Sequence, residues 1–587
     1  MQGGHGPPNG MNRLRRFLVA DTFKAVMKIL LLQPPVQDFY DTAIRLQPLG
    51  LCLLKAAVQR HISGAEVVVR DFHQGFGRRT VPIPRELAYL REYYVHPDVS
   101  PFSTFSHYYH FGAAAEDVGL AAAGERPDLV GISSLFSAYH REALACAREI
   151  KRRLKVPIVM GGAHVSAMPE SVLMDPGVDF VIRGEGERAL VELVQALQER
   201  GDLASVPNLG YKRGSEPIMN PMAVNYPLDE LPPADLSDFA NGRYLFEERP
   251  LCSLVISRGC PHRCAFCSVQ STSGTAYRKR PPEQVLAEIR QHYREGYRVF
   301  NFEDDNLTYH QEGFRRLLEG CIDEFPEGEI RLLAMNGISY LSLNRGLLGL
   351  MKRAGFHHLD VSLVSAEDAT LARMGRPHRL EQYVEVVEEA HLMGLPMVSY
   401  QILGLPGEPI EAMISTMALM ARLPVIIGAS IFYLTPGCAL AAESPPFTPE
   451  DLMRARSIAM ARVNEHISRD DLYSLFISAR IINFLKGIPL PSRQSTLKEA
   501  LDGAGGCGQR ARIGAELLER LLAEKRLYAA TRNGRRLLSR FRPEVFFRVC
   551  EEAGYLRTRQ GAVIVLGGWR DLAVETRNSK QQDLNPV

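Results

Sequence analysis

Short apolar runs that alternate with amphipathic segments are the feature that most restricts how this 587-residue chain folds. From residue 28 onward, five runs are separated by helix-like segments such as HREALACAREIKRRL (140–154) and RALVELVQALQER (188–200). The runs are KILLL (28–32), EVVVR (66–70), DLVGIS (128–133), PIVMG (157–161) and DFVIR (179–183). Continuous apolar strands separated by helices are typical of a parallel sheet covered on both faces. The pattern predicts an α/β fold that begins with a doubly wound, Rossmann-like domain over residues 27–212.

A second alternating series follows a stretch rich in Pro and Asp, which we interpret as a linker over residues 213–245. Its runs are CSLVIS (252–257), RVFNF (298–302), RLLAMN (331–336), HLDVSLV (358–364), MVSYQIL (397–403) and VIIGASIFYL (425–434). Six strand–helix units in succession predict a partial (β/α)6 barrel over residues 246–445, with its chemistry at the C-terminal ends of the strands. The pattern of residues 446–587 indicates a mostly helical C-terminal domain of unknown role. The first 26 residues are rich in Gly, Pro and Arg, and we expect residues 1–26 to form a disordered extension.

The composition excludes several classes of protein. A formal net charge of +2 gives no reason to expect DNA as a partner. No stretch reaches the roughly 18 uninterrupted apolar residues of a membrane helix, and no apolar signal segment follows the N-terminus. Ten cysteines are too sparse for a disulfide scaffold. We therefore expect a cytoplasmic protein without a transmembrane segment, in which a cysteine cluster binds metal or takes part in catalysis.

Such a cluster lies in LVISRGCPHRCAFCSVQ (254–270), directly after the first run of the second series. Cys260, Cys264 and Cys267 have the spacing C-x3-C-x2-C, and no fourth Cys or His stands at the spacing of a closed zinc site. Three thiolates suit a [4Fe–4S] cluster in which one iron keeps an open position. Arg258 and Arg263 would add positive charge beside this anionic group.

The segment resembles the signature of the radical S-adenosylmethionine (SAM) enzymes. The resemblance implies that the open iron chelates the amino and carboxylate groups of SAM, and that reductive cleavage of SAM yields a 5′-deoxyadenosyl radical. It also implies an electron donor such as flavodoxin or ferredoxin, and it places Phe266 among the residues beside the cofactor.

Other residues at strand ends resemble further parts of that family's SAM site. NFEDDN (301–306) is similar to the acidic motif that holds the SAM amine, with Glu303 or Asp304 as the ligand. Ser365 would reach the ribose or carboxylate, and Gly404 in QILGLPGE (401–408) would allow close backbone approach to the adenine. Two residues depart from the family pattern: Val364 replaces the acid of a Gly-Ile-Glu-Ser-Gly motif, and Tyr400 stands where glycine is common.

The first domain carries a second resemblance. RGEGERA (183–189) formally matches a dinucleotide fingerprint, but Glu185 and Glu187 would repel a pyrophosphate. SSLFSAYH (133–140), MGGAHVSAMPE (160–170) and RLQPLGL (45–51) instead resemble the cobalamin-binding domain that precedes many radical SAM barrels. Small residues at successive strand ends leave room there for a large flat ligand. By position, the residues that would line cobalamin are Ser133, Ser134, Gly161, Gly162, His164, Gly184 and Glu185.

The usual corrinoid motif Asp-x-His-x-x-Gly is only approached by DFHQGF (71–76), where Phe76 fills the glycine position and the segment follows the second strand. The loop after the first strand, QPPVQDFYDT (33–42), contains no histidine. We therefore expect cobalamin bound without a protein histidine on cobalt, and we expect His73 to be a polar loop residue.

Together the resemblances imply a cobalamin-dependent radical SAM enzyme. The most favoured reaction is methylation of an unactivated carbon of a small-molecule, lipid or peptide substrate. Two alternatives stay open: a cyclisation or rearrangement without net methyl transfer, and a cobalamin and iron–sulfur sensor without turnover. Cys438, just after the sixth strand, is a candidate substrate contact or a buried spacer. The 13 Lys and Arg against 6 Asp and Glu between residues 510 and 559 form either an anion-docking surface or a solvated helical face.

Overall fold

The computed structural model describes residues 27–40, 47–94, 97–105, 107–222, 226–239, 242–461, 463 and 466–567. The disorder predicted for residues 1–26, and part of the RLQPLGL motif, lie outside these residues. The chain forms two compact units. The first contains the described residues of 1–81, 108–300 and 435–453, and the second contains those of 82–107, 301–434 and 454–587. The domain boundaries expected from the sequence remain predictions.

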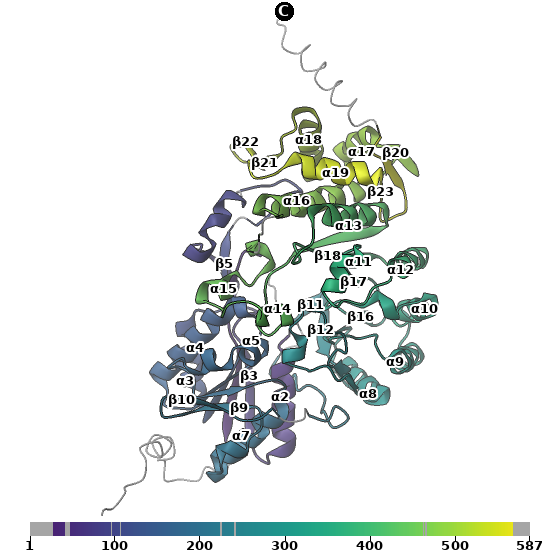
Figure 1. Cartoon of the computed structure of the whole chain (residues 1–587). Helices are drawn as coiled ribbons and strands as arrows, with labels where there is room; N and C mark the ends of the chain where they lie inside the picture. The colour runs from purple at the N-terminus through teal and green to yellow at the C-terminus, as the bar shows by residue number, and fades with distance from the viewer. Residues whose placement is uncertain are drawn as a thin grey trace, which may run out of the picture. The chain divides into compact units, whose positions relative to one another are not determined.

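A seven-stranded sheet is the centre of the first unit, in the order β10-β9-β8-β7-β6-β1-β3 (Figure 1). Its strands are β1 (Lys28–Gln33), β3 (Glu66–Asp71), β6 (Leu129–Ser133), β7 (Ile158–Gly161), β8 (Phe180–Ile182), β9 (Leu209–Arg213) and β10 (Glu216–Met219). The five predicted runs are the parallel strands β1, β3, β6, β7 and β8, whereas β9 and β10 add an antiparallel hairpin that was not expected. The strand order reverses between β1 and β6, and the carboxyl edge at such a switch point is where ligands bind in open α/β sheets.

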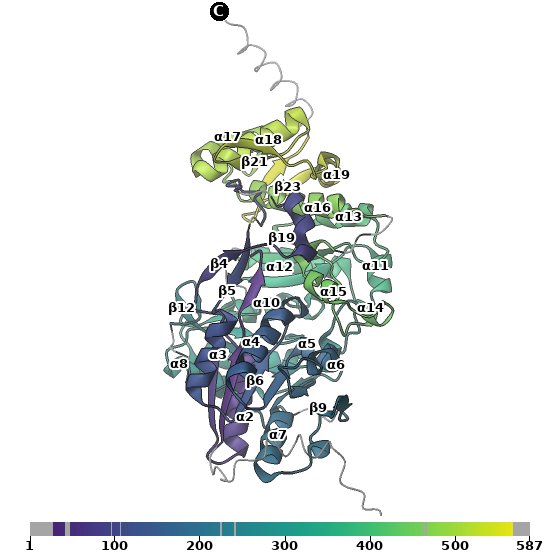
Figure 2. The same cartoon turned by 90° about the vertical axis from the view of Figure 1, so that its left-hand side faces the viewer.

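Helices cover both faces of this sheet, as the apolar strands require. α3 packs against α4, in front of the sheet in Figure 2, and α2 packs against α7. The helices of this unit are α2 (Leu49–His61), α3 (Ala115–Glu125), α4 (His140–Arg153), α5 (Ala163–Ala167), α6 (Pro169–Leu173), α7 (Glu187–Glu199), α8 (Pro282–Arg294) and α14 (Ala439–Ala442); α15 (Pro449–Arg454) lies at the return to the second unit. Three further strands, β2 (Val36–Asp38), β5 (Tyr108–Phe111) and β4 (Arg78–Val81), form a separate small antiparallel sheet in that order.

The second series of strands begins in the first unit. β11 (Leu245–Phe246) pairs antiparallel with β12 (Arg249–Leu254), and β15 (Val299–Phe302) starts beside β12. The remaining barrel strands belong to the second unit: β16 (Arg331–Leu333) next to the end of β15, then the parallel set β17 (Leu359–Val364), β18 (Met397–Leu403) and β19 (Val425–Ile431). All six predicted barrel strands are therefore present.

The rest of the second unit is mostly helical, as expected for the C-terminal part. Its helices are α9 (Gln311–Glu324), α10 (Arg345–Arg353), α11 (Asp368–Arg373), α12 (Leu380–Leu392), α13 (Ile410–Arg422), α16 (Arg469–Lys486), α17 (Leu497–Ala504), α18 (Gln509–Glu524) and α19 (Pro543–Ala553). Its short strands are β20 (Gln494–Thr496), β21 (Tyr528–Thr531), β22 (Gly534–Leu537), β23 (Tyr555–Arg557) and β24 (Val563–Val565). No helix in the described part of the chain is long and apolar enough to cross a membrane.

Candidate functional site

The three motif cysteines lie on one loop whose ends are held together by a short hairpin. β13 (Ser257–Arg258) pairs antiparallel with β14 (Arg278–Lys279), so that Arg258 lies opposite Arg278. Across the loop, the backbone N–H of Cys260 donates to the carbonyl of Gly274 at 3.3 Å. Gly259 has φ +83°, and a Cβ there would stand 2.3 Å from the carbonyl oxygen of Ala276, so only glycine fits. Gly259 and the pairing of β13 with β14 therefore fix the start of the cysteine loop.

The three motif cysteines are available as ligands for an iron–sulfur cluster. Cys264 is buried and Cys260 and Cys267 are half-buried, and all ten cysteines of the chain are thiols outside disulfides in the described structure. A [4Fe–4S] cluster is held by Cys thiolates, so three thiols on one loop fit it with one iron left open. Phe266, which precedes Cys267, is half-buried.

The segment that follows β19 packs against this cysteine loop within the first unit. The backbone N–H of Leu440 donates to the carbonyl of Ala265 at 3.1 Å, and a Cβ on Gly437 would lie 2.8 Å from the Ser271 hydroxyl oxygen. Cys438 lies between them with 3% of its surface exposed. The burial favours the buried-spacer interpretation of Cys438.

The predicted cobalamin residues lie at the carboxyl ends of neighbouring parallel strands. Ser133 ends β6 and Gly161 ends β7, directly beside it in the register. A Cβ on Gly161 would meet only the carbonyl oxygen of Ile182, at 3.7 Å, so the edge is open at this position. Ser134 is 3% exposed, and its N–H donates to the Gly161 carbonyl at 2.7 Å.

Gly162 and Gly184 make the turns that leave these strands. Gly162 has φ +116°, and a Cβ there would lie 2.6 Å from the carbonyl oxygen of Ser134. Gly184 has φ +68° and donates its N–H to the Ser166 hydroxyl at 2.8 Å. Large apolar side chains stand exposed just after β6, with Leu135 at 42% and Phe136 at 50%. The small residues at these strand ends leave space, and the exposed Leu135 and Phe136 offer an apolar surface beside it. This combination fits a corrin ring, whose faces are broad and largely apolar.

His73 and His164, the two histidines that the sequence singled out, are packing residues. His164 is 3% exposed, its Nδ1 lies 2.9 Å from the Ser137 hydroxyl, and its ring is 5.5 Å from that of His140. Burial, with the nearby His140, lowers the pKa of His164 to about 3, so the ring is neutral at physiological pH. His73 is 2% exposed with its ring 6.2 Å from Phe111. His73 lies in the loop between β3 and β4, as expected from the sequence, and is buried there. The expectation that cobalt carries no protein histidine stays a prediction.

The carboxylate of Glu185, expected beside cobalamin, forms ion pairs instead. It bonds to Arg278 and, at 3.2 Å, to Arg258 of the cysteine-loop hairpin. Arg258 also forms a two-point ion pair with Glu187, at 2.6 and 3.2 Å. The charge of Arg258 is therefore balanced by these two carboxylates, whereas the sequence had suggested that it would act on the cluster. Arg263 is exposed.

In the second unit, the acidic motif after β15 is held by two asparagines. Glu303 accepts hydrogen bonds from Asn301 Nδ2 at 2.5 Å and from Asn336 Nδ2 at 3.0 Å. Asp304 is 2% exposed, whereas Glu303 is half-buried. Of the two candidates for the SAM amine, Glu303 has the accessible and oriented carboxylate.

Ser365 and Gly404 lie at the ends of β17 and β18. Ser365 is fully buried, and its hydroxyl donates to Glu408 Oε1 at 2.7 Å rather than pointing to an open site. Burial raises the pKa of Glu408 to about 7. Gly404 has φ +82°, and a Cβ there would lie 2.9 Å from Leu472 Cδ2. Sequence reasoning missed Glu408, although it stands four residues after Gly404 in the motif that was quoted.

Both departures from the family pattern have structural consequences in the second unit. Val364 adopts φ +74°, a conformation strained for a β-branched residue, at a register shift between β17 and β18. Tyr400 is 37% exposed, lies against Gly428 of β19, and donates its hydroxyl to Asp360 Oδ1 at 3.1 Å. Tyr400 thus covers part of the sheet face that a glycine would leave open.

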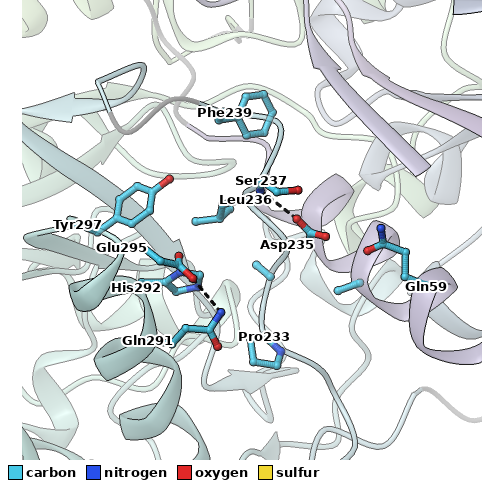
Figure 3. Close-up of a pocket in the computed structure, with 12 residues that line it drawn as sticks. Gln59, Pro233, Asp235, Leu236, Ser237, Phe239, Gln291, His292, Glu295 and Tyr297 are labelled. Carbon is cyan, nitrogen blue, oxygen red and sulfur yellow. Dashed lines mark hydrogen bonds and ion pairs between the residues drawn. The ribbon is translucent and has the colours of Figure 1, made fainter. Parts of the chain in front are cut away.

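A separate pocket of about 580 Å³ lies between α2, the segment 233–239 and the end of α8 (Figure 3). Gln59, Asp235, His292 and Glu295 are among its polar lining residues. Figure 3 shows Gln291 bonded to Glu295 on one side and Asp235 bonded to Ser237 on the other. The pocket adjoins the start of β15, whereas barrel chemistry is found where the strands end. We therefore place the site at the cysteine loop and the sheet edge, not here.

Comparison with known proteins agrees with this placement. The family model described as the radical SAM superfamily matches residues 254–420, and the model of the B12 binding domain matches residues 101–194. An uncharacterized methyltransferase of Pyrococcus horikoshii is 30% identical over 305 residues, which cover 51% of this chain and 65% of that protein. The hopanoid C-3 methylase of Methylococcus capsulatus is 24% identical over 477 residues, covering 80% and 83% of the two chains.

Solved structures share the fold. The radical SAM methyltransferase TsrM of Kitasatospora setae, with cobalamin and a [4Fe-4S] cluster bound, aligns with a TM-score of 0.55 at 20% identity, over 71% of this chain and 74% of that one. The cobalamin-dependent SAM radical enzyme OxsB, with aqua-cobalamin and SAM bound, aligns with a TM-score of 0.57 at 13% identity, over 95% and 81%.

Proposed function

This chain belongs to the cobalamin-dependent radical SAM enzymes, and we propose that it methylates an unactivated carbon of a small-molecule, lipid or peptide substrate. When bound, the [4Fe–4S] cluster and SAM supply a carbon-centred radical, and cobalamin supplies the methyl group. The protein's own residues hold these groups close together and exclude water from them.

The observation that carries the proposal is the direct packing of the cobalamin edge on the cysteine loop. A Cβ on Gly184, at the edge of the sheet, would lie 3.3 Å from the backbone carbonyl oxygen of Thr272 in that loop. Both features belong to the first unit, so their contact does not depend on how the two units are arranged. A radical and a methyl donor must lie within reach of one substrate carbon, and this contact supports that requirement.

Within each unit, the residues have separate roles. The three cysteines would hold the cluster, and the small residues at Ser133, Gly161 and Gly184 would admit cobalamin. Glu303, oriented by Asn301 and Asn336, would accept hydrogen bonds from the amine of SAM. We further propose that a small electron-transfer protein such as flavodoxin or ferredoxin reduces the cluster, in a reducing compartment such as the cytoplasm.

The test uses SAM with a deuterated methyl group and protein purified anaerobically from cells supplied with cobalamin. The reduced protein is incubated with small-molecule and lipid extracts of its source cells, and products are identified by mass spectrometry. Methylation predicts 5′-deoxyadenosine together with a product in which a deuterated methyl group replaces a hydrogen. A cyclisation would give a product without label, and a sensor without turnover would give no 5′-deoxyadenosine; either result would contradict the proposal.

A further inference from the structure

The loop after β8 and the first residue of α7 carry two buried carboxylates, Glu185 and Glu187, that are bonded to the hairpin at the start of the cysteine loop. Glu187 forms a two-point pair with Arg258, at 2.6 and 3.2 Å. Glu185 forms a two-point pair with Arg278, one contact being 3.1 Å, and also lies 3.2 Å from Arg258. We refer to Glu185, Glu187, Arg258 and Arg278 as the carboxylate–arginine clamp.

The clamp is balanced in charge and shielded from water. The side chains of Glu185 and Glu187 are 6% and 4% exposed, and those of Arg258 and Arg278 are 13% and 23% exposed. Burial alone would raise the pKa of Glu187, but the Arg258 guanidinium holds it below the usual range. The same carboxylates raise the pKa of Arg258 against the effect of its burial. Glu187 and Arg258 therefore compensate each other, and the loss of one partner leaves a buried charge uncompensated.

The position of the clamp joins the two cofactor sites. On one side, Glu185 directly follows Gly184, the last small residue of the cobalamin edge. On the other side, Arg258 and Arg278 lie opposite each other in the hairpin, and Cys260 is two residues beyond Arg258. Two-point pairs between a guanidinium and a carboxylate fix direction as well as distance. A shift of the loop after β8 is therefore transmitted to the start of the cysteine loop.

We propose that the carboxylate–arginine clamp is a positioning device that couples cobalamin occupancy of the sheet edge to the order of the cysteine loop. When cobalamin settles against Gly184, the loop that carries Glu185 and Glu187 is fixed, and the clamp fixes the hairpin at the root of the cluster. The four residues act through the loops they hold and do not contact the reacting atoms. The inference rests on the two cofactors and not on methyl transfer.

Hydrogen–deuterium exchange tests the coupling without any activity assay. Exchange of the backbone amides in residues 259–277 is measured on full-length protein with its cluster reconstituted, before and after addition of hydroxocobalamin. Wild type is expected to show slower exchange both at the sheet edge, residues 133–136 and 161–166, and in residues 259–277. In Glu187→Gln, the sheet edge should still be protected, but the added protection of residues 259–277 should fall about tenfold, as expected for the loss of one charge-assisted pair.

Glu288→Gln is the matched control. Glu288 is also buried, and it pairs with Arg280 at 2.5 Å, just beyond the other arm of the same hairpin, without touching the loop after β8. Glu288→Gln should loosen the hairpin generally but keep the cobalamin-dependent protection of residues 259–277. If Glu187→Gln does not fold, Arg258→Lys keeps the charge but loses the two-point geometry, and should show the same selective loss.

Equal cobalamin-dependent protection of residues 259–277 in Glu187→Gln and wild type would overturn the proposal. So would a wild type in which cobalamin protects the sheet edge alone. Cobalt content measured on the same samples separates these results from a failure of cobalamin to bind, which would contradict the cofactor assignment instead. As a spectroscopic readout, the electron paramagnetic resonance line shape of the reduced cluster should respond to cobalamin in wild type and in Glu288→Gln, but not in Glu187→Gln.

Discussion

Glu408 is a buried acid that its position in the sequence did not reveal. It is 1% exposed and accepts a hydrogen bond from the equally buried Ser365. Its Oε2 is buried without a hydrogen-bond partner in the structure. A lone carboxylate in such surroundings favours its protonated form, which explains why its pKa is raised to about 7. The motif QILGLPGE thus supplies, besides Gly404 with its positive φ, a buried acid that links the ends of β17 and β18.

Glu408→Gln is expected to remove a pH-dependent cost of folding. Since the pKa is about 7 in the folded protein and near 4.5 when exposed, folding binds a proton, and this contribution to stability falls as pH rises from about 4.5 to 7. The full effect is about 3.5 kcal/mol, at about 1.4 kcal/mol per pKa unit. Thermal unfolding should show that the variant gains stability relative to wild type at pH 8 but not at pH 5.

Glu411→Gln is the control for that experiment. Glu411 lies in the first turn of α13, and its pKa is lowered by a backbone hydrogen bond and by Arg548. A lowered pKa stabilises the fold above the unfolded value, so this variant should lose a little stability at pH 8 relative to pH 5. If both variants showed the same pH dependence, the assignment of a raised pKa to Glu408 would be wrong.

At the scale of elements, the turn between β7 and α5 is set by a glycine that has no substitute. Gly162→Ala would force a Cβ to within 2.6 Å of the Ser134 carbonyl oxygen at φ +116°. The loops after β6 and β7 must then separate, which distorts the cobalamin cradle. We expect the variant to fold but to retain several-fold less cobalt after gel filtration, measured by elemental analysis.

Gly124→Ala in α3 is the matched substitution in the same unit. A Cβ there would meet nothing within 4 Å, and alanine favours a helix over glycine. Its cobalt content should equal that of wild type. Equal retention by Gly162→Ala as well would show that cobalamin does not use this turn.

Elements were predicted well where a local pattern defines them and poorly where distant residues do. All eleven strands expected from apolar runs are present, because a buried parallel strand is apolar on both faces. β9 and β10 were missed because an edge hairpin such as LGYKR is half polar. Residues 82–107 lie within the first predicted domain, yet Tyr93 bonds to Asp470 at 2.6 Å and Asp98 accepts from the N–H of Ala530 at 3.0 Å, within the second unit. No local pattern encodes such contacts.

In the candidate site, too, local patterns were predictable and contacts between distant residues were not. The cysteine spacing was visible because its ligands are consecutive on one loop. The partners of Glu185 and Glu187 were not, because Arg258 and Arg278 are about 70 to 90 residues away in sequence. In the sequence these carboxylates argued against a dinucleotide, and Glu185 was expected beside cobalamin; the structure adds the arginines that they bind.

On the scale of the whole molecule, the proposed methyl transfer requires two cofactors, the iron–sulfur cluster and cobalamin, that bind to separate parts of one chain. Cys264→Ala should lose the iron and all formation of 5′-deoxyadenosine from SAM. It should retain cobalamin, because the sheet edge at β6 and β7 does not depend on that side chain. The measurement is iron and cobalt content together with SAM cleavage. A variant that still cleaves SAM would show that the cluster is held elsewhere.

Cobalt and iron content of the wild-type protein, purified anaerobically from cells supplied with cobalamin, shows whether both cofactors bind this chain. We expect one cobalt and about four irons per chain, with a visible spectrum that contains both chromophores. Iron without cobalt would leave the radical SAM barrel in place but would contradict both the cobalamin site and the methyl transfer proposed from it.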